Sequence, residues 1–470
     1  MFRVSESTLL MPWCRTAGAV IAGLLLALSW SQLGPPDAIG GRDHLVKDGV
    51  PVTLLLPENS GASDGRYPGV VVAHGFAGSR RMMLGYGYSL ASAGYAVALP
   101  DFSGHGANGT ILSRSRDTVS SPLQHDIDAA LGVLRERPEV DPRRIAVLGH
   151  SMGSGAAMAA AIAAPDTYGA VVAVSPTDAP VTEALPRDLL LQAGAWEPRF
   201  LANARRLLAA AGGRSTTGNR RSLEVIPNVE HITIVYSQRS QRSAVEWIGE
   251  SLGNSRQSGY ADRRLLWYGL FTVAVVMFMV LLSPILRRLA PERPDRGAGG
   301  LPALRGSRGV PLMMLTPVLA GALTGGGATL AANLNDGALP AVLGLSVGGF
   351  VGLWALIMGA LWLAMGVRPA LPRPKSLLLG LVSFAVLWLT LGLAGQQVLF
   401  QWILVPYRLA RWPLLSLWVL PWLLAAGYLH VSATRIQRLG IYLGQTVAIV
   451  AVLALHGDRK STRLNSSHYS

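Results

Sequence analysis

The stretch Ile145–Gly153, which reads I-A-V-L-G-H-S-M-G, constrains the fold of this chain most strongly. Its apolar residues predict a buried strand, and the small residues Ser154–Ala161 after the turn predict a helix. A serine in such a turn has a strained backbone, so Gly149 and Gly153 on either side must lack a Cβ atom. The pattern G-x-S-x-G predicts that Ser151 presents its hydroxyl at the C-terminal edge of a sheet, above a helix N-terminus. The alternative is an ordinary glycine-rich turn before a helix.

The composition predicts a protein that lies partly in a membrane. Hydrophobic residues make up 50% of the 470 residues and the mean hydropathy is +0.36, which is too apolar for a purely soluble chain. A formal net charge of +14 is compatible with a protein that binds nucleic acid, but many of the arginines lie in short loops between apolar runs. Positive cytoplasmic loops explain this better, so we expect no nucleic-acid partner. Cys14 is the only cysteine, which excludes an intramolecular disulfide.

Residues 1–36 predict an N-terminal signal anchor. Arg3 and Arg15 precede the uncharged run Ala17–Leu33, and a Gly-Pro-Pro sequence ends it. A cleaved signal peptide is the alternative, but no small-x-small cleavage site follows Leu28. The arginines place the N-terminal end of this anchor in the cytoplasm.

Residues 37–261 have the pattern of a soluble α/β domain. Asp48-Gly49 predicts a hairpin turn, and the continuous apolar runs Gly69–Ala73 and Tyr95–Leu99 predict strands covered on both faces. Strands that alternate with helices predict a parallel sheet wrapped on both sides. Further strands are predicted at Ala170–Val174, Leu189–Ala193 and Leu223–Ile226, and helices at Met82–Ala93, Leu123–Glu136, Leu201–Ala211 and Ser243–Leu252.

Residues 262–457 predict an all-α transmembrane region of about six spans. Leu265–Leu286 carries no charge and is long enough to cross a bilayer, and Arg287-Arg288 follows it. Placing the arginine-rich loops inside leaves residues 37–261 on the extracytoplasmic side of a bacterial inner or plasma membrane. Residues 458–470 resemble a translated sequencing adapter, so we expect the last span to be truncated. The other spans are predicted at Val310–Asn333, Leu339–Val367, Ser376–Gly395, Pro413–Ala433 and from Ile441.

An activated serine needs donors for the negative charge that develops on the substrate oxygen. The sequence H-G-F-A-G begins at His74, directly after the predicted strand Gly69–Ala73. A backbone N–H in this loop, predicted to be that of Phe76, can join the N–H of Met152 as an oxyanion hole.

The serine also needs a base and an acid that orients the base. The predicted strand Leu189–Ala193 is followed by G-A-W-E, which puts Glu197 at the C-terminal edge of a strand. His231 lies in a loop after the last predicted strand and before the last helix of the domain. The order serine, acid, histidine is the one expected for an α/β-hydrolase.

Residues from about Leu45 to Leu252 resemble the α/β-hydrolase superfamily, within its dienelactone hydrolase-like and serine aminopeptidase-like proteins. The motifs are H-G-F-A-G, P-D-F-S-G-H-G, G-H-S-M-G, G-A-W-E and E-H-I-T. The resemblance implies a doubly wound, mostly parallel sheet, with Ser151 as nucleophile, His231 as general base and then acid, and Glu197 as the group that orients His231. Asp is commoner at the acid position of the family, and Asp178 is the alternative acid.

Other candidate groups are predicted to be structural. His74, His105 and His150 do not follow the last strand, so they are poor candidates for the base. Asp101 is predicted to tie turns together. The sequence contains no metal-ligand spacing, P-loop or dinucleotide fingerprint, so we expect neither metal nor cofactor. Only Ser175–Asp188 separates two predicted strands where family members often insert a lid, which predicts an open site.

These patterns predict a membrane-anchored serine hydrolase that cleaves small carboxylic esters through an acyl-enzyme intermediate. A serine peptidase or amidase and an acyltransferase are alternatives within the same chemistry. A third alternative is a non-catalytic, hydrolase-fold binding module of a membrane transporter. The intact serine, histidine and oxyanion loop, and the scarcity of charged residues in the spans, favour an enzyme. The patterns indicate neither the natural substrate nor the oligomeric state.

Overall fold

The structure is a computed structural model of the whole chain, and its description covers most of the sequence. The described residues are 12–58, 65–110, 112, 120–216, 218–254, 256–289, 309–334, 347–367, 369, 373–399, 401, 405–432 and 438–450. The predicted adapter sequence at residues 458–470 lies outside them.

An eight-stranded sheet forms the centre of the α/β domain, with the strand order β1-β2-β4-β3-β5-β6-β7-β8. The pairs β1–β2 and β2–β4 are antiparallel, and all other neighbours are parallel. This confirms the predicted mostly parallel sheet. The strands are β1 (Ile39–Lys47), β2 (Val50–Pro57), β3 (Tyr67–Ala73), β4 (Ala96–Pro100), β5 (Val140–His150), β6 (Tyr168–Val174), β7 (Leu189–Gly194) and β8 (Arg221–Ile226).

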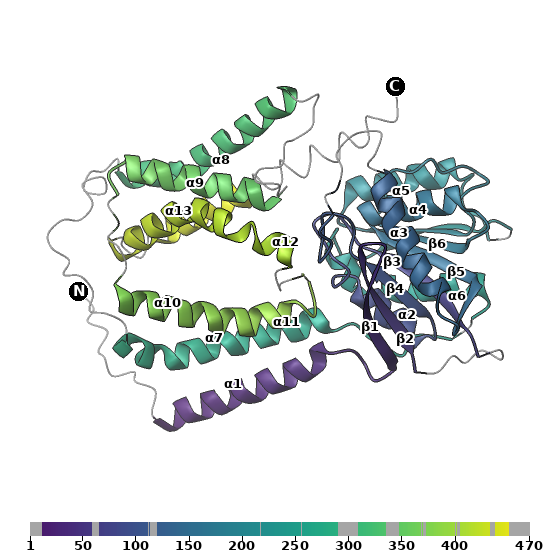
Figure 1. The fold of residues 1–470 in the computed structure, drawn as a ribbon, viewed down its shortest axis with the longest axis horizontal. Helices are drawn as coiled ribbons and strands as arrows, with labels where there is room; N and C mark the ends of the chain where they lie inside the picture. The colour runs from purple at the N-terminus through teal and green to yellow at the C-terminus, as the bar shows by residue number, and fades with distance from the viewer. Residues whose placement is uncertain are drawn as a thin grey trace. The chain divides into compact units, whose positions relative to one another are not determined.

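Helices cover both faces of this sheet (Figure 1). Alternate residues of β3 face opposite sides: Val70 and Val72 belong to one core, and Val71 and Ala73 belong to the other. This alternation explains why the central strands are apolar throughout. Helices α2 (Leu84–Ser92) and α6 (Gln238–Leu252) pack in the first core, and α3 (Ser120–Arg135), α4 (Met152–Ala163) and α5 (Pro198–Ala210) pack in the second.

The predicted hairpin turn is confirmed. Asp48 and Gly49 join β1 to β2 and both have positive φ angles, 50° and 80°. A two-residue turn with this backbone matches the twist of an antiparallel pair, and Asp-Gly is among the sequences that tolerate it.

Several helices begin earlier than the sequence predicts, among them α3, α4, α5 and α6. Local chemistry explains the starts of α5 and α6. Helix α5 begins at Pro198, because proline at the first helical position has a suitable φ angle and needs no intrahelical acceptor. Helix α6 begins at Gln238, where the Ser237 side chain caps the helix by accepting a hydrogen bond from the Ser240 N–H.

Contacts group the chain into two compact units. The first comprises Met1–Leu286 and Ser383–Leu404, and the second comprises Arg287–Val382 and Val405–Ser470. The α/β domain therefore shares its unit with α1 (Pro12–Leu33), most of α7 (Arg264–Leu289), the π-helix η3 (Trp388–Gly392) and α11 (Leu393–Gly395).

Helices α1 and α7 pack against each other within the first unit. The Arg15 guanidinium donates to the carbonyl of Leu281 at 3.1 Å, and the rings of Trp30 and Phe271 lie 6.0 Å apart. These contacts place the N-terminal end of α1 beside the C-terminal part of α7.

The second unit contains apolar helices with tryptophans at their contacts. Trp354 donates to the Pro317 carbonyl at 3.2 Å, and Trp362 donates to the Thr316 hydroxyl at 2.8 Å. Both tryptophans are buried. The helices are α8 (Gly309–Leu334), α9 (Val347–Ala364), most of α10 (Pro374–Leu387), α12 (Pro406–Leu409), α13 (Trp412–Ser432) and Arg438–Val450.

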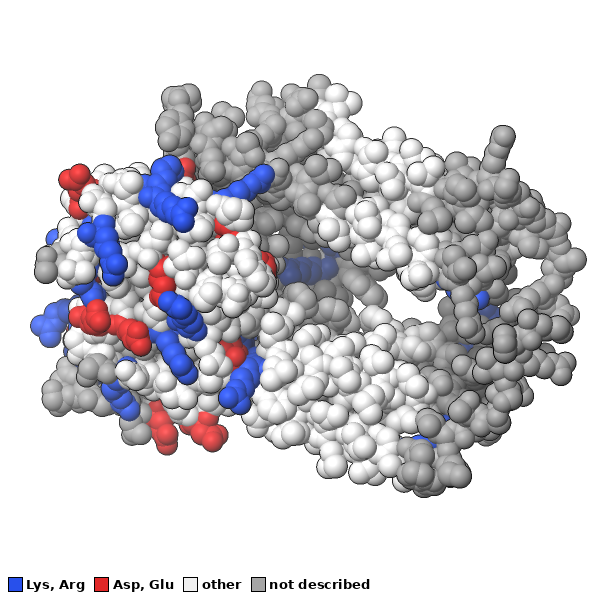
Figure 2. All heavy atoms as spheres, turned by 180° about the vertical axis from the view of Figure 1, so that it is seen from behind, with Lys and Arg blue, Asp and Glu red and all other residues white. Residues whose placement is uncertain are grey.

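Three of the described helices are long and apolar enough to cross a membrane: Arg264–Leu282, Pro374–Gly395 and Trp412–Leu429. They coincide with three of the predicted spans. Figure 2 shows charged side chains spread over the α/β domain, whereas the described helical surface in that view is mostly uncharged. The length and composition of these helices make them candidate spans.

Candidate functional site

Ser151 lies in the tight turn between β5 and α4. Its backbone has φ 52° and ψ −121°, which confirms the predicted strained conformation. A Cβ atom at Gly149 would collide with the carbonyl of Gly153, and a Cβ atom at Gly153 would lie 2.6 Å from the carbonyl oxygen of His74. Neither glycine can carry a side chain without moving the turn.

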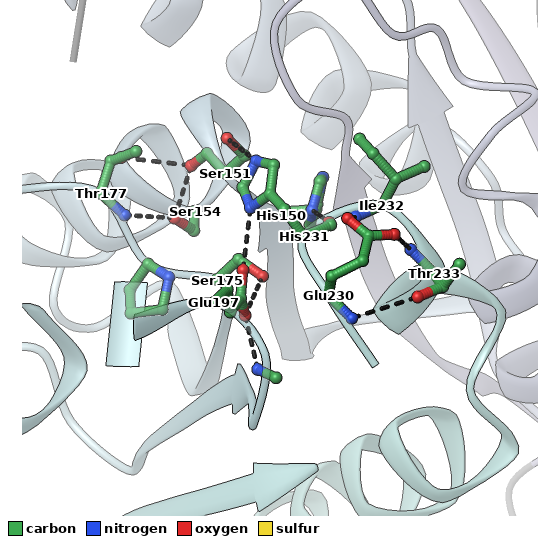
Figure 3. A network of polar contacts seen from close by, with 12 residues as sticks. His150, Ser151, Ser154, Ser175, Thr177, Glu197, Glu230, His231, Ile232 and Thr233 are labelled. Atoms are coloured by element: carbon green, nitrogen blue, oxygen red, sulfur yellow. Dashed lines mark hydrogen bonds and ion pairs between the residues drawn. The ribbon is translucent and has the colours of Figure 1, made fainter. Parts of the chain in front are cut away.

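Hydrogen bonds hold both backbone polar groups of Ser151. Its N–H donates to the Val174 carbonyl at 2.9 Å, and its carbonyl accepts from the hydroxyls of Ser154 and Thr177 (Figure 3). The turn is therefore fixed from β6 and from its own helix. The side-chain hydroxyl of Ser151 is left for another partner.

That partner is His231, in the loop between β8 and the 3₁₀ helix η1 (Thr233–Tyr236). Its Nε2 atom lies 3.0 Å from the Ser151 Oγ, and its Nδ1 atom lies 2.9 Å from Glu197 Oε2. Because a carboxylate accepts but does not donate, Nδ1 carries the proton and Nε2 accepts from the serine hydroxyl. The imidazole thus joins the serine to the carboxylate in the tautomer that a general base requires.

Glu197 precedes α5 and is 5% exposed. Its Oε1 atom accepts from the Ser175 hydroxyl at 2.7 Å and from the backbone N–H of Gly194. These two donors stabilise the charged carboxylate in a buried position and leave Oε2 for His231.

The alternative acid, Asp178, has a different partner. Its carboxylate pairs with the guanidinium of Arg206 on α5. The structure thus brings Glu197, not Asp178, into contact with His231.

The predicted oxyanion donors lie on segments that adjoin Ser151. Met152 is the first residue of α4, so its N–H has no intrahelical acceptor. Phe76 lies in a turn that the hydrogen bond from the Gly78 N–H to the Gly75 carbonyl closes at 3.1 Å. A Cβ atom at Gly75 would lie 3.1 Å from the Ser151 Cβ, so the turn passes directly beside the nucleophile.

Three further histidines are buried near this edge of the sheet. His74 Nε2 accepts from the Phe102 N–H at 3.0 Å, its Nδ1 donates to the Gly75 carbonyl at 2.8 Å, and burial lowers its pKa to about 4. His105 Nδ1 donates to the Ser103 carbonyl at 2.9 Å. Each of these two rings therefore supports a neighbouring turn.

His150 contacts the His231 loop directly. Its Nε2 donates to the His231 carbonyl at 2.8 Å, the two rings lie 4.9 Å apart, and burial lowers the pKa of His150 to about 3. The neutral ring therefore holds the backbone that carries the imidazole.

Asp101 accepts two backbone hydrogen bonds. Its carboxylate oxygens accept from the N–H groups of Arg80 and Ala107, both at 2.8 Å. Asp101 thereby joins two turns, as the sequence suggests.

Sequence reasoning missed two side chains that contact the Ser151–His231–Glu197 group. Ser175, at the end of β6, has φ 46° and donates to Glu197. The Phe200 ring stacks on His231 with centroids 4.0 Å apart and 17° between the planes. The available signal for Phe200 was its nearness in sequence to Glu197, because Glu197 directly precedes α5 and Phe200 lies in the first turn of that helix.

The described residues contain no cluster of three or more histidine, cysteine or acidic side chains that could hold a metal ion. The site is built from side chains of a serine, a histidine and a glutamate, with backbone N–H groups beside them.

Part of the α/β domain is similar to known proteins. Residues 68–253 match the family model described as serine aminopeptidase, S33. A solved structure, the dienelactone hydrolase from Anabaena variabilis, is 20% identical, with 45% of this chain and 98% of that chain covered and a TM-score of 0.34. The matched residues lie within the α/β domain, which is therefore similar to a hydrolase family over most of its sheet.

Two relatives align over parts of the chain. An uncharacterized protein of Mycobacterium tuberculosis is 33% identical over 164 residues, which are 31% of this chain and 55% of that protein. Bis(hydroxyethyl) terephthalate hydrolase of Streptomyces coelicolor is 31% identical over 119 residues, which are 25% of this chain and 36% of that protein. The chain thus spans about half the length of the first relative and about a third of the second.

Proposed function

We propose that this chain is a membrane-anchored serine hydrolase that cleaves carboxylic esters through an acyl-enzyme intermediate. The observation that carries the proposal is the imidazole of His231, which lies 3.0 Å from the Ser151 hydroxyl and 2.9 Å from the Glu197 carboxylate. An uncharged hydroxyl is a weak nucleophile until a base takes its proton, and this arrangement supplies the base.

The reaction begins when Ser151 Oγ attacks the ester carbonyl carbon and passes its proton to His231 Nε2. Glu197 stabilises the imidazolium that forms and keeps its ring in position. His231 then returns the proton to the alcohol oxygen as the carbon–oxygen bond breaks. Water attacks the acyl-serine with the same base, which releases the carboxylic acid and regenerates the serine.

The negative oxygen of each tetrahedral intermediate needs hydrogen-bond donors. We assign this role to the N–H groups of Met152 and Phe76. The Met152 N–H belongs to the first turn of α4, where the helix dipole also favours negative charge. Gly75 lies close to Ser151, which supports a role in the oxyanion hole for the turn that contains Phe76.

Apolar side chains beside the acid and the base favour an ester with an apolar group. Trp196 is 64% exposed and Ile232 is 46% exposed, and each is adjacent in sequence to Glu197 or His231. Phe200 stacks on the imidazole. The relative named bis(hydroxyethyl) terephthalate hydrolase acts on an ester of this kind.

A serine aminopeptidase is the second candidate, because the matching family model has that description. Such an enzyme needs an acidic group for the amino terminus of its substrate. Two carboxylates near the triad in sequence already have partners: Glu230 accepts from the N–H groups of Ile232 and Thr233, and Asp178 pairs with Arg206. These contacts favour the ester over the peptide.

Candidate spans support the membrane anchor. The apolar helix Arg264–Leu282 follows the α/β domain, and Arg15 lies beside Leu281 in the same unit. In the sequence, Arg287 and Arg288 follow this apolar run, and Arg3 and Arg15 precede the first one. Positive-inside orientation would place the α/β domain outside the cytoplasm.

A fluorophosphonate probe tests the proposal. We expect the full-length protein to be labelled, Ser151→Ala to lose the label, and the control Ser243→Ala, on α6, to keep it. Activity on p-nitrophenyl esters, compared with aminoacyl p-nitroanilides, separates esterase from peptidase. Absence of Ser151-dependent labelling in the folded protein would show that the domain is a binding module.

A further inference from the structure

Three arginines gather where the α/β domain meets the apolar helices of its own unit. We call Arg42, Arg80 and Arg81 the arginine cluster. Arg42 lies on β1, and Arg80 and Arg81 precede α2. Burial lowers the pKa of His44 to about 4, and the positive charges of all three arginines add to this effect.

The arginine cluster has more positive charge than its carboxylates balance. Arg80 Nη1 lies 3.4 Å from Asp101 Oδ2, an oxygen that already accepts from the Ala107 N–H. Arg42 donates to the Tyr88 hydroxyl at 3.3 Å, a neutral acceptor. Within the described residues, neither Arg42 nor Arg81 has a carboxylate at ion-pair distance.

Among the residues that the structure describes, the Arg81 guanidinium likewise donates only to neutral groups. Its Nε donates to the Gln401 side chain at 2.9 Å, and its Nη1 donates to the Gln396 carbonyl at 3.2 Å. Burial, with the charges of Arg80 and Arg42 nearby, lowers the pKa of Arg81 to about 10. Burying like charges together is unfavourable unless an anion compensates them.

Several donors of the arginine cluster are buried without an acceptor. Among the described residues, Nε of Arg80, which is 7% exposed, and Nε of Arg42 have no hydrogen-bond acceptor. Arg80 Nη1 has its ion pair with Asp101 at 3.4 Å but no hydrogen bond. A buried donor without an acceptor destabilises the fold, and guanidinium groups bind oxyanions through two parallel hydrogen bonds. Both the charge and the buried donors therefore favour the binding of an anionic group at this cluster.

The contacts of the cluster place it at the ends of two candidate spans. One begins at Arg264 and the other ends at Gly395, directly before Gln396. Arg264 Nη1 donates to the Gln397 carbonyl at 3.1 Å, so the start of one span lies beside the end of the other. Figure 1 shows the corresponding helices α7 and α11 next to each other. The ends of membrane spans lie at the depth of lipid headgroups.

Arg264 itself does not need an anion. Its Nε and Nη2 atoms donate to the two oxygens of Asp262, at 2.9 and 2.8 Å. This complete pair beside the arginine cluster shows how the chain satisfies a buried guanidinium when it supplies the carboxylate itself.

We propose that the arginine cluster binds the phosphate group of an anionic membrane lipid. The phosphate would accept hydrogen bonds from Arg42 and Arg80 and balance the charge of Arg81. This proposal rests on the membrane anchor of the proposed function and not on its chemistry. It predicts a lipid held next to the turn that carries Phe76, because Arg80 follows that turn closely in the chain.

Native mass spectrometry of the full-length protein in detergent tests the proposal, with phosphatidylglycerol as probe and diacylglycerol of the same chains as the phosphate-free control. We expect phosphatidylglycerol adducts, few diacylglycerol adducts, and about five-fold weaker lipid binding in R42Q and in R80Q. R42K should keep most of the binding. R137Q is the matched control, since Arg137 already pairs with Asp43 at 2.7 Å, and it should bind lipid as the wild type does.

Unchanged lipid binding in R42Q and R80Q would overturn the proposal, and so would an equal loss in R137Q. Displacement of the lipid by inorganic phosphate, with the same arginine dependence, would assign the cluster to free phosphate instead. Fluorophosphonate labelling of Ser151 in R42Q reports folding and hydrolase chemistry separately from lipid binding. Arg42 is only partly buried, so R42Q should fold even if R80Q does not, and R42Q alone is then sufficient to test the proposal.

Discussion

Replacing Glu197 by glutamine should abolish the base without disturbing the fold. The carboxylate has three donors around it: Ser175 Oγ and Gly194 N–H at Oε1, and His231 Nδ1–H at Oε2. A glutamine has one oxygen and one NH₂ group. The backbone N–H of Gly194 cannot reverse, so the amide oxygen must stay at the Oε1 position.

The NH₂ group of the glutamine must therefore face His231. An NH₂ group only donates, so Nδ1 must become the acceptor and the ring proton must move to Nε2. Nε2 then presents an N–H to Ser151 and cannot take its proton. The wrong tautomer costs about ten-thousand-fold in kcat, or about 5 kcal/mol in the barrier. Loss of one ordinary hydrogen bond would cost only about 1 kcal/mol, or less than ten-fold.

The assay is turnover of a p-nitrophenyl ester, with thermal melting of the same preparations. Glu224→Gln is the matched control: Glu224 lies on β8 and pairs with Arg239, away from the triad residues' contacts, and it should keep its activity. A loss below ten-fold in folded Glu197→Gln, together with a severe loss in Asp178→Asn, would refute the reasoning and make Asp178 the acid.

Three further outcomes follow from contacts of the site. His150→Phe removes the donor to the His231 carbonyl, so kcat should fall about ten-fold while KM stays unchanged. His150→Gln should restore kcat because its amide can donate to the same carbonyl. Full kcat in the phenylalanine variant would exclude a positioning role for His150. Phe200→Ala removes the ring stacked on His231, so kcat/KM should fall about three- to ten-fold, while Phe200→Tyr keeps it; equal values in a steady-state assay would contradict this. Burial keeps His74 and His150 neutral in the folded state, with pKa values of about 4 and 3, whereas unfolded histidines bind protons below 6.5. Stability should thus be full above pH 6.5 and fall by about 1.4 kcal/mol per pH unit for each histidine as the pH drops toward 4. Thermal melting across this pH range measures the slope, and an unchanged slope in His150→Gln would contradict the role of burial.

The sequence predicts the parts of the site that depend on backbone geometry. Gly149 and Gly153 flank Ser151 because the turn has no space for a Cβ atom, and this requirement is visible in the motif. The carboxyl ends of parallel strands share one edge of a sheet, which is why Glu197 and His231 could be placed beside Ser151 from chain order.

Other parts depend on side-chain contacts between distant segments. Ser175 contacts Glu197 because β6 and β7 are neighbours and because Ser175 has a positive φ angle. No pattern in the sequence predicts either feature. The stacking of Phe200 on His231 requires the register of α5 over the loop after β8. The polar start of α6 has no apolar period, so its first turn was missed although Ser237 caps it.

The association of η1 and α6 with α11 and the nearby Val398 has a practical consequence for recombinant work. Tyr236 donates its hydroxyl to the Val398 carbonyl at 3.0 Å, and Val398 and Ala394 are fully buried in the same core as α6. A truncated version that stops near Ala261 would expose to solvent the apolar surface that Ala394 and Val398 cover. Such a fragment should aggregate during purification unless polar side chains replace the exposed apolar ones. The detergent-solubilised whole chain is therefore the better starting material for crystallisation.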